Sequence, residues 1–204
     1  MADTVAPEFA RFIDAERRAK RVADLPGRMV EGQVFEPVFV EQGQATELMR
    51  VAARRAAGFY RPTQRSEVVW VDGDRELAVG FAAVEVKMTD GLLGVFIPVR
   101  CDQTGPVVMQ VAFAVGSAGK PGGVFAAAHR RPYGPELIVS IWGEALVAFA
   151  WQCVLGLVSQ IAGATGKDAR GNVLVPVEFM ADAKGLQIVP MARYRFSGSS
   201  GLKT

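Results

Sequence analysis

Hydrophobic and polar positions alternate through the middle of the chain, and turn residues separate the runs. Between residues 66 and 115, Asp-Gly pairs stand at 72–73 and 90–91, and a polar segment follows at 102–106. Turns of this kind join neighbouring strands of antiparallel hairpins. The spacing therefore predicts a meander of four strands with one strongly apolar face.

The last two of these strands show the clearest alternation. In each strand every second residue is apolar, which places five apolar side chains on one face. These residues are Leu93, Val95, Ile97, Val99 and Cys101 in one strand, and Val107, Met109, Val111, Phe113 and Val115 in the next. We expect this face of the sheet to carry the core.

The stretch from Leu137 to Gly163 is long enough to cross a bilayer, which takes about 20 apolar residues. On a helical projection, however, its polar residues gather on one side, with Gln160 as the exception. That side holds Ser140, Glu144, Gln152 and Ser159, and the apolar side holds Val139, Trp142, Leu146, Phe149, Ala150, Cys153, Leu157 and Ile161. A helix in lipid has no need of such a division, so the pattern predicts the core helix of a soluble protein.

Two further features of this helix concern its neighbours. Ile141, Trp151 and Leu155 interrupt the polar side, which indicates that the helix is covered on two sides. We expect a sheet on one side and another helix or a second subunit on the other. Gly143 and Gly156 would let another backbone come close.

The remaining segments predict two helices and two extended regions. The helices cover residues 5–25 and 46–59, and residues 29–40 look extended, with Pro37 marking an edge strand or a bulge. Residues 172–180 and 186–196 flank a turn and predict a closing hairpin. If the turn of that hairpin centres on Ala183, Pro176 and Pro190 oppose each other, which fits a non-hydrogen-bonded pair because neither has an N–H to donate.

For the second helix the predicted buried face consists of Leu48, Val51, Ala52, Ala56 and Phe59. The sum is an α+β fold, in which an antiparallel meander sheet of about seven strands packs on one long apolar helix, with two N-terminal helices. Residues 1–196 are expected to form a single domain, with a possible helical appendage over 1–65. Residues 197–204 are small and polar and predict a disordered tail.

Composition narrows the function classes. Half of the 204 residues are hydrophobic and the net charge is only +2, so no overall basic field attracts nucleic acid. Cys101 and Cys153 stand in apolar runs and are expected to be reduced core thiols. No cysteine–histidine spacing suits zinc, and we assign no metal and no cofactor. The first 25 residues lack the apolar core of a signal peptide, which predicts a cytoplasmic protein.

One group of residues could bind a small anionic ligand. His129 is the only histidine, and Arg130, Arg131 and Tyr133 follow it closely. Two guanidinium groups beside an imidazole suit phosphate or carboxylate. Glu144, the one charge in the apolar helix, is a further candidate, since carboxylates in apolar surroundings are enriched at functional sites. The alternatives are an exposed basic connection and a solvent-facing carboxylate.

A second group of residues could contact phosphates of a nucleic acid. The cations of the two N-terminal helices are Arg17, Arg18, Lys20, Arg21, Arg50, Arg54 and Arg55. Acidic residues are interleaved with them, and no aromatic residues for base stacking stand between them. A solvated helix face explains the same pattern.

Three functions therefore remain open. The favoured one is a non-catalytic protein-assembly or binding module, homo-oligomeric, because no coherent catalytic set is present. The second is a small-molecule-binding protein or an enzyme, with a pocket between the sheet and the long helix near Glu144 and with His129 at its mouth. The third is a nucleic-acid-binding accessory protein. We expect self-association, with other proteins as further candidates, and neither nucleic acid nor a membrane as the main partner.

Overall fold

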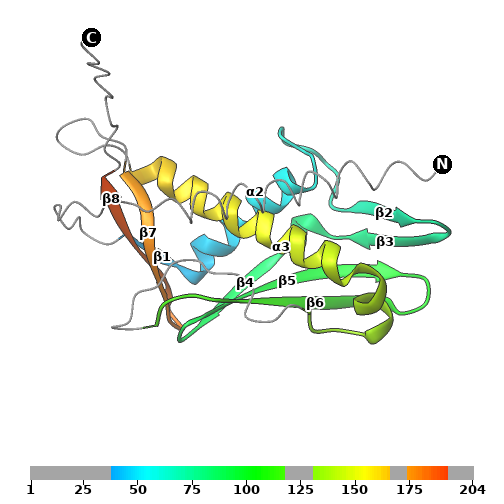
Figure 1. The fold of residues 1–204 in the computed structure, drawn as a ribbon. Coiled ribbons are helices and arrows are strands. Elements are labelled where there is room, and N and C mark those ends of the chain that lie inside the picture. Colours follow the sequence, from blue (N-terminus) through cyan, green and yellow to red (C-terminus); the bar gives the residue numbers. More distant parts are fainter. Residues whose placement is uncertain (1–37, 118–130, 166–173, 193–204) are drawn as a thin grey trace, which may run out of the picture.

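The computed structural model describes residues 38–117, 131–165 and 174–192 (Figure 1). The predicted helix over 5–25 and the predicted tail over 197–204 lie outside these ranges. Along the chain the elements are β1 (Val38–Glu41), α2 (Gln42–Ala56), β2 (Val68–Asp72), β3 (Arg75–Val79), the 3-10 helix η1 (Phe81–Ala83), β4 (Glu85–Thr89), β5 (Leu92–Cys101), β6 (Gly105–Ala114), α3 (Glu136–Thr165), β7 (Leu174–Ala181) and β8 (Gly185–Ala192).

The predicted α+β class with antiparallel strands and one long helix is confirmed. In the described ranges the strands number eight and form two sheets, where the sequence had suggested one sheet of about seven strands. In the five-stranded sheet, β4 pairs with the first half of β5, β3 pairs with its last residues, and β6 pairs along its whole length. Because β6 occupies one edge of β5, β3 and β4 share the other edge. The predicted meander is thus present, with its second strand interrupted by η1.

The three-stranded sheet has the order β1-β8-β7. Pro176 pairs with Pro190 in it, as predicted, and β1 lies at its edge directly after Pro37. Ala181 joins this sheet to the larger one, because its N–H donates to Gly116 O at 2.9 Å and its carbonyl accepts from Gly91 N–H at 3.1 Å. The two sheets are therefore connected by hydrogen bonds between residues far apart in the sequence.

Helix α3 runs across one face of the five-stranded sheet, and α2 crosses it (Figure 1). All eight residues predicted for the apolar side of α3 are buried. The length and composition of α3 over Glu136–Ile161 would allow it to cross a membrane, and half of its most apolar 18-residue window is buried inside the protein. Cys101 and Cys153 are free and buried, which confirms the prediction.

Helix α2 covers a second side of α3. Gln160 donates to Leu48 O at 3.0 Å, which explains why this polar residue stands outside the polar arc. One helical turn away, a Cβ atom added at Gly156 would lie 2.7 Å from Ala52 Cβ, so the two helices are in close contact there, as the glycine predicted. The second cover of α3 is therefore a helix of the same chain.

The buried face of α2 differs from the prediction. Its fully buried residues are Ala45, Met49, Ala52 and Ala53, so only Ala52 of the predicted set is fully buried, while Leu48, Ala56 and Phe59 are partly buried against the same core. The helix is turned because one of its polar stripes, which sequence reasoning assigned to solvent, faces β4. Val40, Ala45 and Met49 belong to the same core as the sheet and α3, so residues from Val38 onward pack into that core.

Candidate functional site

The residues predicted to form an anion site are only partly described. His129 and Arg130 lie outside the described residues. Arg131 forms an ion pair with Glu136 in the first turn of α3. Tyr133 holds its segment against β6 through backbone bonds, since its N–H donates to Gln110 O at 2.8 Å and its carbonyl accepts from Gln110 N–H at 2.9 Å. The described part of this group therefore serves the fold.

Glu144 lies on the exposed side of α3. The layer between α3 and the sheet is occupied by buried apolar and aromatic side chains. Trp70 of β2 contacts Trp142 and Phe149 of α3, with ring centroids 6.3 and 5.8 Å apart. The carboxylate of Glu144 consequently faces solvent and does not line this layer.

Three of the seven residues of the predicted basic group are described. Arg17, Arg18, Lys20 and Arg21 lie outside the described residues. Arg50 contacts Glu47 at 2.8 Å and donates from Nε to Val84 O at 3.3 Å, so it belongs to the packing of α2. Arg54 and Arg55 stand in the last turn of α2, where their charge stabilises the negative end of the helix dipole.

Four arginines lie in the last turn of α2 and in the segment that follows it. Gly58 takes a φ of 90°, and Phe59 N–H donates to Arg54 O at 3.0 Å while Gly58 N–H donates to Arg55 O at 2.9 Å. These two bonds define a Schellman motif, which folds Phe59 back toward the last turn. The guanidinium of Arg65 lies 5.8 Å from the Phe59 ring.

We call Arg54, Arg55, Arg61 and Arg65 the arginine surface. None of the four forms an ion pair with a carboxylate in the described part of the chain. The Nε atom of Arg54 is buried without a hydrogen-bond partner, and the neighbouring Tyr60 is 79% exposed. Sequence reasoning missed Arg61 and Arg65, and the contact of Arg65 with Phe59 depends on the turn at Gly58.

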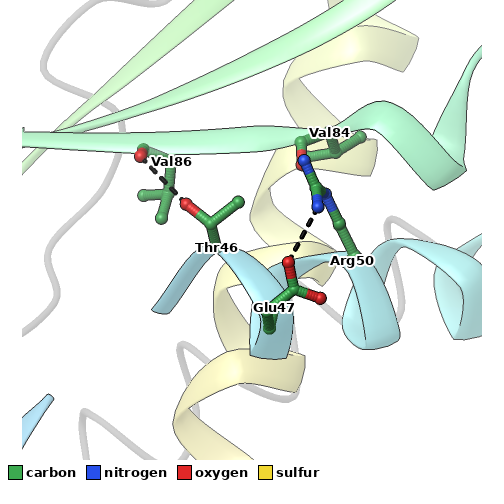
Figure 2. Close-up of polar contacts among 5 residues, drawn as sticks. All are labelled: Thr46, Glu47, Arg50, Val84 and Val86. Atoms are coloured by element: carbon green, nitrogen blue, oxygen red, sulfur yellow. Dashed lines mark hydrogen bonds and ion pairs between the residues drawn. The ribbon is translucent and has the colours of Figure 1, made fainter. Parts of the chain in front are cut away.

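The edge of the sheet at β4 is closed by side chains of α2 (Figure 2). Thr46 Oγ1 donates to Val86 O at 3.4 Å, Arg50 donates to Val84 O, and Gln42 Oε1 accepts from Met88 N–H at 3.2 Å. Four helical residues rise about 6 Å and two strand residues about 6.8 Å, so helix positions four apart match strand positions two apart. The helix thus satisfies edge groups that another strand would otherwise bond.

The edge of the sheet at β2, which lies on the same side of β5 as the β4 edge, is open. Among the described strands β2 pairs only with β3, in a register where Asp72 faces Arg75 across a two-residue turn. Such a turn is closed by a hydrogen-bonded pair, here Asp72 and Arg75, and non-hydrogen-bonded and hydrogen-bonded pairs then alternate along the two strands. Val69 and Val71 fall in non-hydrogen-bonded pairs, so they direct their N–H and C=O groups away from β3. No described hydrogen bond reaches these groups.

The side chains of this edge are also uncovered. Trp70 faces α3, so Val69 and Val71 project from the opposite face of the sheet, where they are 49% and 43% exposed. From Val68 to Val71 the strand contains no charge, no proline and no glycine. Proteins usually protect such edges with charges, prolines or a covering element, so the β2 edge is the candidate functional site.

The carboxylates at the tip of the β2–β3 hairpin serve the turn. Asp72 and Asp74 flank Gly73, whose φ of 64° fits a tight hairpin turn. Within the described ranges no group of three histidine, cysteine, aspartate or glutamate side chains is placed to hold a metal ion.

Comparisons of this chain with models of known protein families, with curated proteins and with solved structures gave no match.

Proposed function

We propose that the protein is a non-catalytic assembly module that works in the cytoplasm by associating with further copies of itself. The observation that carries this proposal is the difference between β4 and β2, two strands whose outer edges lie on the same side of the five-stranded sheet. Side chains of α2 bond two backbone groups of β4 and the carbonyl of Val84 just before it, whereas the outward groups of Val69 and Val71 in β2 bond no described residue. An uncharged strand with free backbone groups is a template for pairing with another chain.

The long helix does not supply the interface. Its apolar side packs on the sheet and a second side packs on α2, so α3 needs no second subunit to cover it. We therefore expect the interface on the sheet and not on α3. The internal packing of this most apolar segment also supports a protein that works in aqueous solution.

The test is light scattering coupled to size-exclusion chromatography, in buffer without detergent, at low and at high salt. We expect a discrete species larger than the 21.9 kDa chain and free of nucleic acid absorbance. Backbone pairing and apolar contacts tolerate salt, so the mass should be the same in both buffers. A monomer at every concentration up to about 100 µM, where weak transient interfaces are normally populated, would contradict the proposal.

The arginine surface favours one second candidate, the binding of an anionic polymer such as single-stranded nucleic acid. Its four guanidinium groups lack described acidic partners, and the exposed ring of Tyr60 beside them could stack on a base. The test is the retention of a single-stranded oligonucleotide at rising salt. A double change, Arg61→Ser with Arg65→Ser, should reduce the salt dependence, whereas Arg75→Ser on the β2–β3 hairpin should not.

A further inference from the structure

The open edge of β2 points to a specific interface. We infer that two copies of the chain pair through their β2 strands, antiparallel, around a two-fold axis at Trp70. The pairing joins the two five-stranded sheets into one continuous sheet. This inference rests on the proposed function, because it names the surface through which the module assembles.

The backbone of β2 is complementary to itself. Val69 and Val71 stand symmetrically on either side of Trp70, and both direct their N–H and C=O groups outward. When a second β2 approaches antiparallel with the two Trp70 residues opposed, Val69 of each copy faces Val71 of the other. Each of these two pairs then exchanges two hydrogen bonds, which satisfies all eight outward groups of the two valines in both copies.

The register follows from the bounds of the strand. Shifts by one residue are excluded, because they would set outward-directed residues opposite residues that are already bonded to β3. Shifts by two residues keep the bonding pattern but overlap only part of the strand. The register centred on Trp70 aligns the full length of Val68–Asp72 in both copies, so it forms the longest ladder.

The side chains suit the same arrangement. On the face away from α3, Val69 and Val71 of both copies form one cluster of four valines, which removes their exposed area from water. No like charges oppose each other within the ladder, since Asp72 faces Val68 of the second copy. The interface is isologous, as expected for the commonest kind of homo-oligomer.

The first experiment removes one backbone donor. Val71→Pro deletes an N–H that β3 does not use and places a proline in an edge strand, where folds tolerate it. We expect the dimer dissociation constant, measured by sedimentation, to rise at least tenfold. Val71→Thr keeps the N–H and the β-branched shape and should change the constant by less than threefold. Val69→Lys, which adds a charge at an exposed position, gives a second disrupting variant, and circular dichroism melts verify that each variant is folded.

The second experiment reads the register with engineered disulfides. In the proposed register residue 69 faces residue 71 of the second copy, at a Cα separation of about 5.5 Å, which a disulfide spans. The double variant Val69→Cys with Val71→Cys should therefore form covalent dimers on mild oxidation. Val69→Cys alone should not, because a 69–69 disulfide requires a register shifted by two residues.

The outcomes separate this inference from the proposed function. An oligomer that persists in folded Val71→Pro and Val69→Lys variants overturns the β2 interface and leaves assembly through another surface. A wild-type monomer overturns both statements. A disulfide in the single Val69→Cys variant, or none in the double variant, overturns the register centred on Trp70.

Discussion

At the scale of single residues, the contact of α2 with α3 depends on one glycine. A Cβ atom at position 156 would lie 2.7 Å from Ala52 Cβ and 3.3 Å from Ala52 Cα, closer than packing allows. Gly156→Ala should therefore destabilise the fold by about 1–3 kcal/mol, although alanine favours a helix. Urea denaturation measures the change.

The matched control lies on the same helix. At Gly143 an added Cβ would lie 3.5 Å from Pro132 and 3.7 Å from Val139, which are ordinary contacts. Gly143→Ala should stabilise the fold by up to about 1 kcal/mol through helix propensity alone. If both variants shift stability in the same direction, the close contact of the helices does not decide the effect. Ala52→Gly should relieve most of the loss in the Gly156→Ala protein.

A second residue, Cys153, links stability to pH. Burial raises the pKa of its thiol above the ordinary value of 9.0. Above that pH the native state keeps a proton that the unfolded state loses. The contribution of the protonated thiol to the free energy of unfolding is therefore complete below pH 9 and is lost as the pH rises further. The loss should reach about 1.4 kcal/mol per pH unit.

The measurement compares urea denaturation of the wild type with that of Cys153→Val, between pH 8 and pH 11. Other groups titrate in both proteins, so the difference between them isolates the thiol. We expect the two curves to run parallel below pH 9 and the wild type to fall more steeply above it. Parallel curves throughout would mean that Cys153 ionises without unfolding.

At the scale of elements, helix α2 acts as a cover for the edge of β4. Thr46→Val keeps the size of the side chain but removes the donor to Val86 O. An acceptor left without a partner should cost about 1 kcal/mol, seen as a lower urea midpoint with an unchanged slope. Thr89→Val, at an exposed position of β4 whose side chain bonds no described partner, should leave the midpoint unchanged.

The packing of some elements was predictable from the sequence, and the packing of others was not. The buried side of α3 was predictable because its apolar residues repeat at the helical period. The Pro176–Pro190 pair was predictable because the two prolines lie at equal distances from the expected turn, and neither needs to donate a hydrogen bond there. The buried face of α2 was not, because Thr46 and Arg50 look like surface residues until β4 supplies acceptors for them. The open edge was hidden for a similar reason. The strand Val68–Asp72 was predicted, but its outer position depends on β3 and β4 sharing one side of β5.

At the scale of the whole molecule, the outward amides of β4 and of β2 should differ in their rates of hydrogen exchange. The Met88 amide is buried and bonded to Gln42, so it should exchange slowly at every protein concentration. In dilute protein Val69 and Val71 should exchange fast, whereas Trp70 between them, bonded to β3, should exchange slowly.

Raising the concentration into the range where the oligomer forms should slow Val69 and Val71 at least tenfold and leave Trp70 and Met88 unchanged, because only the outward amides gain partners. Gln42→Leu serves as the control for the covered edge, since it should speed exchange of Met88 alone. If Val69 and Val71 stay fast in protein that sedimentation shows to be oligomeric, the copies meet through another surface, and the β2 edge is open for a different strand.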